Sequence, residues 1–507
     1  YEGKGNKSMK KILTIGLLAL LVGVNALPAS AALQASAAGE VKTLRIYNWS
    51  DYIYEPEEED EAPSIIDQFI AKKRAEGVTV EVVYDTYATN EDMYNIMKLG
   101  KASYDLIAPS DYMIQKMAAE NMLEEFDYDP LTQTYPDIPN YSTYASPYLK
   151  DVYDDINVSQ YAVGYMWGTL GIVYNPNIDD GLGGTTTDDQ MLEDLKSWAA
   201  LWDPKYKGKV SIKDSMRDTY LIGLIHVHTE EIENLQAQYA AETISKEQFK
   251  AGMATLLNDT SPETIEKVSI ALKELKENIY GLEVDSGKND IVTGKIMMNT
   301  AWSGDAVYAM DIAEEEEGVE LYYSIPEEGA NIWFDGWVMP KGADKELAAE
   351  FLDFVSNPEI AALNMNYIGY TSFIAGQDIL SLVHDWYDAE DGGVTVDLSY
   401  FFAGTITEDP LDPLTSPLIT TDLIGRQFTA QYPTEDEITR CVIMQNFDQE
   451  TNNQIVEMWA DFKASRMSTW MIVVIVVLGV GLGALVAFQI VRRQKSQRHA
   501  RKRVAHK

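Results

Sequence analysis

The chain has 507 residues, which exceeds the usual size of a single domain and predicts at least two hydrophobic cores. Its 80 Asp and Glu against 40 Lys and Arg give a net charge of −40, which excludes nucleic acid as a partner and attracts cations, although solubility alone also explains such acidity. The single cysteine, Cys441, excludes an intramolecular disulfide and a cysteine-ligated metal cluster.

Residues 9–31 have the three parts of a secretory signal peptide. Lys10 and Lys11 precede the apolar run 12–24, and Ala29-Ser30-Ala31 supplies small residues for cleavage. We take Met9 as the start of translation, and no cysteine follows the apolar run to carry a lipid anchor. The sequence therefore predicts a chain that is exported from the cytoplasm.

From residue 42 onward, short apolar runs alternate with segments of helical spacing. The pattern predicts strands at 43–47, 79–84 and 105–108, and helices at 63–76 and 90–99. Further helices are predicted at 190–202, 231–257, 262–279 and 345–356. This alternation is typical of an α/β fold whose sheets are mostly parallel.

Four short loops combine an aromatic side chain with Asp or Ser. They are residues 48–52, 110–112, 302–305 and 333–335, and the first two follow predicted strands. Loops at the carboxyl ends of strands are where α/β sheets bind ligands. Aromatic faces attract ammonium groups by roughly 0.5–2 kcal/mol each, and carboxylates hold ammonium groups by charge-assisted hydrogen bonds. Core packing explains the same residues equally well, so the residues alone leave both interpretations open.

Residues 470–491 form an almost unbroken apolar run at the other end of the chain. At about 1.5 Å per residue this run crosses a hydrocarbon core of about 30 Å. The basic tail 492–507 follows directly, and the positive-inside rule places it in the cytoplasm. We therefore predict an extracytoplasmic protein that is anchored to the cell membrane by a C-terminal transmembrane helix.

No arrangement of residues predicts an enzyme. The chain lacks a credible Ser–His–Asp set and an HExxH motif, and His226 and His228 lie isolated in an apolar predicted helix. Paired carboxylates are the one feature that an extracytoplasmic hydrolase would share. We expect no enzymatic activity, no cofactor and no metal site.

Seven stretches resemble, in order, the polyamine-binding proteins of ABC transporters, which form the spermidine/putrescine family. They read LRIYNWSDYI, VVYDTYATNEDMYNIM, YDLIAPSDYMIQKM, YMWGTLGIVYN, SWAALWDPKYKGKV, NIWFDGWVMP and MNYIGYTS. A weaker likeness runs over residues 432–464. The resemblance implies a two-lobed α/β fold of the periplasmic-binding-protein type (type II). It also implies that a polyamine is held in the cleft between the lobes and delivered to the permease subunits of an ABC transporter.

The resemblance further implies which residues bind the ligand. In this carry-over Asp335 holds one amine beside Trp333, Asp218 contacts the other part of the ligand, and Trp302 is an aromatic wall. The matched positions, of which the last aligns most loosely, are Trp49, Ser50, Asp51, Tyr52, Ser110, Tyr112, Asp218, Trp302, Trp333, Asp335, Tyr370 and Gln445.

Two departures from the family leave its choice of amine open. Ser215 stands where the spermidine binders have an aspartate, three residues before Asp218. Ser50-Asp51 resembles the putrescine-preferring members, whereas residues 333–335 resemble the spermidine-preferring ones. Residues 377–431 also exceed what the family carries there, and their proline-rich sequence predicts a surface elaboration.

The resemblance places one lobe at residues 42–160 and 336–376, and the other at 161–335 and 377–464. Closure about the strands that cross between the lobes would trap the ligand. Two alternatives stay open. One is a sensor ectodomain, which would need a signalling partner in the membrane, and the other is a binding protein for another small cationic solute.

Overall fold

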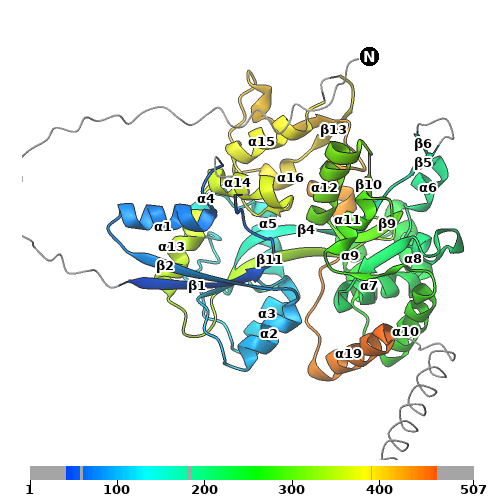
Figure 1. Cartoon of the computed structure of the whole chain (residues 1–507), viewed down its shortest axis with the longest axis horizontal. Coiled ribbons are helices and arrows are strands. Elements are labelled where there is room, and N and C mark those ends of the chain that lie inside the picture. The colour runs from blue at the N-terminus through cyan, green and yellow to red at the C-terminus, as the bar shows by residue number, and fades with distance from the viewer. Residues whose placement is uncertain (1–40, 57–60, 180–184, 390, 465–507) are drawn as a thin grey trace, which may run out of the picture. The chain divides into compact units, whose positions relative to one another are not determined.

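The computed structural model describes residues 41–56, 61–179, 185–389 and 391–464 (Figure 1). Those up to Ile455 belong to one compact unit. A path of eight strands runs through this unit in the order β2-β1-β3-β11-β4-β9-β7-β8, and β10 and β12 pair with β4 beside the path. The strands fall into two parallel groups and a joining pair.

The first half of the sheet is the parallel group β1, β2 and β3. β1 lies in its middle and pairs Lys42 with Val80 of β2 and Ile46 with Leu106 of β3. α1 begins after Ser64, whose side chain accepts a hydrogen bond from a backbone amide of the first turn. Figure 1 shows α1 and α2 on opposite sides of β1 and β2. The bounds are β1 (Lys42–Trp49), α1 (Ile65–Ala75), β2 (Val80–Tyr87), α2 (Asn90–Lys98), β3 (Leu106–Ile107), α3 (Asp111–Ala119), α4 (Pro139–Tyr144) and α5 (Pro147–Asp155).

The second half of the sheet is the group β7, β8 and β9, which are also parallel. Helices α7 and α10 pack together in this half. Its strands and the small hairpin are β5 (Asn177–Asp179), β6 (Thr185–Thr187), β7 (Val210–Lys213), β8 (Gly281–Glu283), β9 (Met298–Trp302) and β10 (Tyr322–Ser324). Its helices are α6 (Asp189–Asp194), α7 (Met216–Val227), α8 (Thr229–Ala240), α9 (Lys246–Leu257), α10 (Pro262–Lys276), α11 (Ser286–Val292) and α12 (Ser303–Ile312).

Two long strands join the halves, and they are antiparallel to their neighbours. β4 (Ala162–Tyr174) is buried along its whole length. Its first part pairs with β11 (Ile332–Val338), whereas its last part pairs with β9 and β10. The register shifts between Asp335 and Gly336 of β11 because Tyr165 of β4 is an extra residue there, and such a bulge bends the strand that carries it. The prediction of mostly parallel sheets is therefore confirmed within each half and wrong for the joining strands.

Two of the predicted helices are each divided. The helix predicted at 190–202 ends as α6 at Asp194, and Ser197 then caps a separate short turn. The helix predicted at 231–257 is α8 and α9, because Ser245 and Gln248 form a capping box that starts a new helix. The other predicted strands and helices are confirmed to within a few residues. Short helical turns lie at Trp198–Trp202, Pro204–Tyr206, Ala313–Glu317 and Pro413–Thr415.

The segment 377–431 is only partly a surface elaboration. Phe401, Phe402 and Phe428 are 0% exposed, whereas Leu411 at the tip is 91% exposed. The surface prediction is therefore confirmed for the proline-rich tip around Leu411 and wrong for Phe401, Phe402 and residues 426–431. The elements after β11 are α13 (Lys345–Val355), α14 (Pro358–Ile368), β12 (Thr371–Ser372), α15 (Gln377–Tyr387), β13 (Val394–Asp397), α16 (Ser399–Phe402), β14 (Leu418–Thr421), α17 (Gln427–Gln431), α18 (Glu435–Arg440) and α19 (Gln449–Lys463).

Among the helices of the described residues, none is both long and apolar enough to cross a bilayer. The predicted signal peptide (9–31), transmembrane helix (470–491) and basic tail (492–507) all lie outside the described residues.

Candidate functional site

Asp335 of β11 lies opposite the bulge of β4, and one of its oxygens has no hydrogen-bond partner among the described residues. The residue is 5% exposed, and its Oδ2 accepts a hydrogen bond of 2.9 Å from the Tyr52 hydroxyl. Its Oδ1 is buried and has no hydrogen-bond partner among the described residues. Ser110 forms a backbone bridge with Asp335 from the first half. A buried carboxylate oxygen without a donor is costly, so it favours binding of a group that carries N–H donors.

Burial also sets the charge of this carboxyl group. Burial raises the pKa of Asp335 to about 7, against the opposing effect of the nearby Ser110 and Tyr52 hydroxyls, and the Asp218 carboxylate raises it further. Near neutral pH the group is therefore close to half ionised. An ammonium group at Oδ1 would favour the charged form and lower this pKa.

Three aromatic rings form a box beside Asp335. The ring of Tyr370 lies edge-on to those of Tyr52 and Trp333, with centroid distances of 5.2 and 5.5 Å. All three side chains are buried, and the Trp333 Nε1 also lacks a partner within the described part of the chain. Gly304 allows this packing, because a Cβ there would lie 2.3 Å from the Tyr370 ring.

Tyr370 is held in place by a buried ion cluster. Its hydroxyl donates to Asp305 Oδ1 at 3.0 Å. The Lys213 ammonium lies 2.8 Å from Asp305 Oδ2 and 3.2 Å from Glu283. Although burial raises the pKa of Asp305, the Lys213 and Lys288 ammonium groups outweigh burial and leave this pKa below its ordinary value. Asp305 therefore already has protein cations and serves to position Tyr370.

Asp218 differs from Asp335 because both of its oxygens are used. The Trp302 Nε1 donates to Oδ2 at 3.1 Å, and the Asn331 side chain donates to Oδ1 at 3.4 Å. Its amide donates to Ser215, which caps α7. Burial raises the pKa of Asp218, and hydrogen bonds from Ser215, Trp302 and Asn331 oppose that rise. Trp302 in turn lies 4.6 Å from the Lys213 ammonium, so one ring face contacts a protein cation.

The loop after β1 contributes less than the sequence predicts. Trp49 is half-buried, and its Nε1 donates to the Ala108 carbonyl at 2.8 Å. Ser50 and Asp51 are exposed, and Asp51 has a φ of 52°. Only Tyr52 of this loop reaches the box around Asp335.

Tyr112 and Gln445 lie around Arg217, a buried residue of α7 that the sequence does not single out. The Arg217 guanidinium stacks on Tyr112 of the first half, 4.5 Å from the ring centroid. It also donates to the Gln445 carbonyl at 2.7 Å, while the Gln445 side chain is exposed. This arginine therefore joins α3 of the first half to α7 of the second half.

The structure thus brings together Tyr52, Ser110, Trp333, Asp335 and Tyr370, and separates them from Ser50, Asp51 and Gln445. The sequence does not single out Asp305, Lys213 or Arg217 as site residues. Asp305 lies in one of the aromatic–acid loops and could have been found there. Lys213 and Arg217 give no local signal, because their partners are distant in the sequence.

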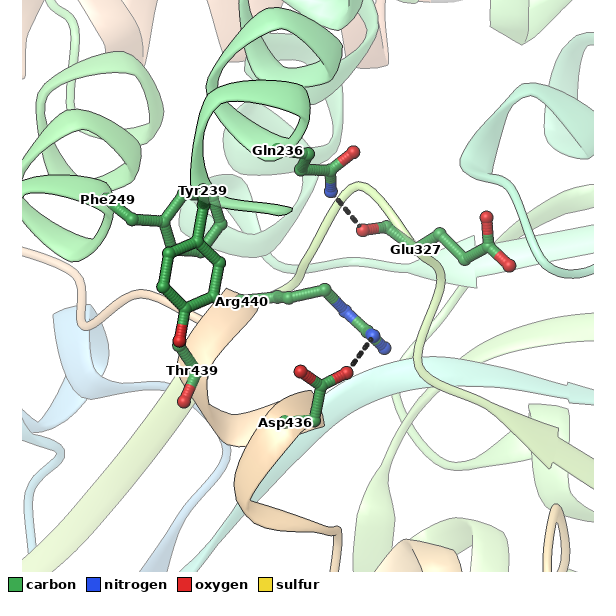
Figure 2. A pocket seen from close by; sticks show the side chains of 7 residues that line it. All are labelled: Gln236, Tyr239, Phe249, Glu327, Asp436, Thr439 and Arg440. Atoms are coloured by element: carbon green, nitrogen blue, oxygen red, sulfur yellow. Dashed lines mark hydrogen bonds and ion pairs between the residues drawn. The ribbon is translucent and has the colours of Figure 1, made fainter. Parts of the chain in front are cut away.

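A separate cavity of about 240 Å³ lies between α8, α9 and α18 (Figure 2). Tyr239 stacks on Phe249 at one side, and Arg440 is paired with Asp436 at another. None of the predicted site residues lines this cavity, so it is not the candidate site. In the described ranges, no three His, Cys, Asp or Glu side chains are grouped so that they could hold a metal ion.

Comparisons with known proteins give relatives that bind polyamines. The pattern of the family of bacterial extracellular solute-binding proteins matches residues 64–380, more than half of the chain. The spermidine/putrescine-binding periplasmic protein of Escherichia coli (strain K12) is 28% identical over 352 residues, which are 69% of this chain and 83% of that protein. The putrescine-binding periplasmic protein PotF of the same strain is 27% identical over 342 residues, which are 66% of this chain and 79% of that protein.

A solved structure gives the fold. The spermidine/putrescine ABC transporter substrate-binding protein PotD from Streptococcus pneumoniae matches with a TM-score of 0.52 at 24% identity. The match covers 83% of this chain and 98% of that chain. The two halves and their joining strands are therefore the two-lobed α/β fold that the sequence predicts.

Proposed function

We propose that this chain, which belongs to the family of bacterial extracellular solute-binding proteins, captures spermidine or putrescine and delivers it to the permease of an ABC transporter. Members of this family bind solutes outside the cytoplasm and are not enzymes. The observation that carries the choice of ligand is the buried, unpaired Oδ1 of Asp335 inside an aromatic box.

A polyamine supplies the positively charged N–H donor that Asp335 Oδ1 lacks. A terminal ammonium group would donate to Asp335 Oδ1 and face the rings of Tyr52, Trp333 and Tyr370, which attract cations. The methylene groups would lie against the same rings. Asp218 and Asp305 have weaker claims on an amine, because their oxygens already accept hydrogen bonds from protein donors.

We also propose that the ligand closes two lobes about the joining strands, with residues 42–160 and 336–376 in one lobe and 161–335 and 377–464 in the other. The register shift between Asp335 and Gly336 supports the boundary at 335/336. The remaining ligand-contact candidates Trp49, Ser50, Asp51, Tyr112, Trp302 and Gln445 would join the site only through a rearrangement during closure.

Calorimetric titration of the purified chain with putrescine, spermidine and spermine tests the proposal. We expect saturable one-to-one binding of at least one amine, and the ranking of the three decides the preference. A folded sample that gives no heat with any of them would refute polyamine capture.

The terminal segments support a further part of the proposal, namely export by residues 9–31 and anchoring by residues 470–491 with a cytoplasmic tail at 492–507. We expect the full chain to sediment with membranes and to release its large domain when protease is added outside the cell. Removal of residues 470–507 should move the protein to the soluble fraction. Sedimentation that does not change on this removal would contradict the anchor.

A further inference from the structure

We propose that residues 377–432 form a brace that joins the two halves of the sheet and limits how far they open. Residues 401–402 and 426–432 of this segment are buried, and α16 and α17 contact the first and the second half respectively. Figure 1 shows α15 and α16 on the same side of β4 as α5 and α12. The brace concerns the movement of the two halves and goes beyond the choice of ligand.

The brace contacts the first half through α16. The Ser146 hydroxyl, at the start of α5, donates to the Phe401 carbonyl at 2.7 Å, and this contact is buried. Tyr148 of α5 lies edge-on to Tyr400, with ring centroids 5.5 Å apart. Phe401 also stacks on Trp167 of the joining strand β4 at 6.0 Å.

The brace contacts the second half through α17 and the residues before it. The Gly425 carbonyl accepts from the Tyr323 amide of β10 at 2.7 Å. The buried Arg426 guanidinium pairs with Glu314 and donates from Nε to the Leu321 carbonyl. The Gln427 side chain donates to Asp311 of α12 at 3.1 Å.

An aromatic cluster connects these two contact regions inside the brace. Tyr432 lies 5.6 Å from Phe401 and 6.3 Å from Phe428, and all three rings are buried. The Tyr400 hydroxyl donates to the Pro433 carbonyl at 2.9 Å. Because close-packed rings resist shear, separation of the halves must break either this cluster or one of the two contact regions.

The brace also holds the backbone on both sides of Tyr370. Gln431 donates from its side chain to the Gly369 carbonyl at 2.8 Å and accepts from the Thr371 hydroxyl at the same distance. The ring of Tyr370 is part of the box around Asp335. Movement of the brace would therefore move an aromatic wall of the candidate site.

Distances between two spin labels test the brace in the unliganded full chain. The labels replace exposed residues of the two halves, Lys101→Cys and Lys250→Cys, and the buried Cys441 is changed to Ser in every sample. One variant removes the first contact region (Ser146→Ala with Tyr148→Ala), and the other removes the second (Arg426→Gln with Gln427→Ala). Leu411→Ala is the matched control, since this side chain belongs to the same segment but is 91% exposed.

We expect a narrow distance distribution for the unmodified brace and for the control. Each brace variant should add a second, differently spaced population, with a rise in the open-to-closed ratio of about tenfold, the change expected for loss of one hydrogen bond at the upper end of the usual range. Circular dichroism identifies any variant that fails to fold. If one brace variant is unfolded, the variant at the other end of the brace tests the proposal. The proposal is overturned if a folded variant keeps the narrow distribution, or if the unmodified chain is already as broad as the variants.

Discussion

Replacement of Asp335 by Asn removes the charge of the candidate site and keeps its shape. The amide oxygen still accepts the hydrogen bond that Tyr52 donates to Oδ2. Without ligand the cost is small, because the neutral form of Asp335 is already about half populated near pH 7. With a polyamine the variant leaves a desolvated ammonium group without its counter-charge. We expect affinity to fall by about 2–5 kcal/mol at pH 8, which corresponds to roughly 30-fold to several thousandfold.

The pH dependence of ligand affinity gives a second test of Asp335. Because the pKa of Asp335 is about 7, an ammonium group that binds at lower pH must first displace a proton. The ionised fraction falls from about one half at pH 7 to about one hundredth at pH 5, so we expect wild-type affinity to weaken about 50-fold over this interval. The Asn variant has no such proton, so its weaker binding should be flat over this range.

Calorimetry of the full chain with putrescine and spermidine at pH 5, 6, 7 and 8 measures both effects, and two buffers of different ionisation enthalpy count the protons released. The control is Asp51→Asn, because the Asp51 side chain is exposed and Asn tolerates its φ of 52°. We expect this control to bind within about threefold of wild type. The reasoning is refuted if Asp335→Asn binds like wild type, or if wild-type affinity is constant from pH 5 to 8.

The same raised pKa makes the unliganded protein less stable at higher pH. The folded state keeps a proton on Asp335 up to about pH 7, whereas the unfolded state loses it near pH 4. The stability that this proton contributes is complete below about pH 4 and is lost as the pH rises to about 7. Asp111, whose pKa burial raises to about 8, acts in the same direction. Urea unfolding at several pH values gives the slope of the unfolding free energy against pH. Asp335→Asn should remove only the part of this slope that Asp335 contributes, and an unchanged slope would contradict the raised pKa of Asp335.

Three further variants test the surroundings of the site. Gly304→Ala places a Cβ 2.3 Å from the Tyr370 ring, so we expect ligand affinity to drop by about 1–3 kcal/mol in calorimetry, and unchanged affinity would contradict the tight packing. Lys213→Met leaves Asp305 and Glu283 buried without their cation, so urea unfolding should show a loss of about 3–5 kcal/mol. Tyr370→Phe keeps the ring and removes its hydrogen bond to Asp305, so we expect a loss of only about 0.5–1.5 kcal/mol in stability, and a larger loss would mean that the ring itself has moved.

Much of the fold could be predicted because its signals are local. The alternation of short apolar runs and helical spacing places β1, α1, β2 and α2 within a few residues of their observed bounds. The division of 231–257 into two helices was missed, although Ser245 and Gln248 already form a capping-box signature in the sequence. The antiparallel joining strands could not be predicted, because the direction of a strand depends on which distant partner it pairs with.

The sequence predicts which residues make up the candidate site, but it does not predict what each of them does there. One carboxylate, three rings and one serine from the aromatic–acid loops and their surroundings do meet, and the resemblance to a family selects all five of them. Local sequence gives Asp305 and Asp335 the same weight, since each follows a tryptophan by two or three residues. It also gives no reason to treat Asp51 as exposed or Phe401 and Phe402 as buried.

The sequence by itself determined the layered α/β fold, because the alternation of strands and helices follows from side-chain periodicity over a few residues. It also showed that aromatic rings and carboxylates share short loops, but it left open whether those loops are core or a binding site. Only the tertiary structure decided which carboxylate is free to hold a cation. Lys213 neutralises Asp305 across 92 positions of sequence, and Trp302 donates to Asp218 across 84, whereas the Oδ1 of Asp335 is buried without a donor among the described residues. Desolvation and pairing depend on what the fold places within a few ångströms, and that proximity is not encoded in the spacing of residues along the chain.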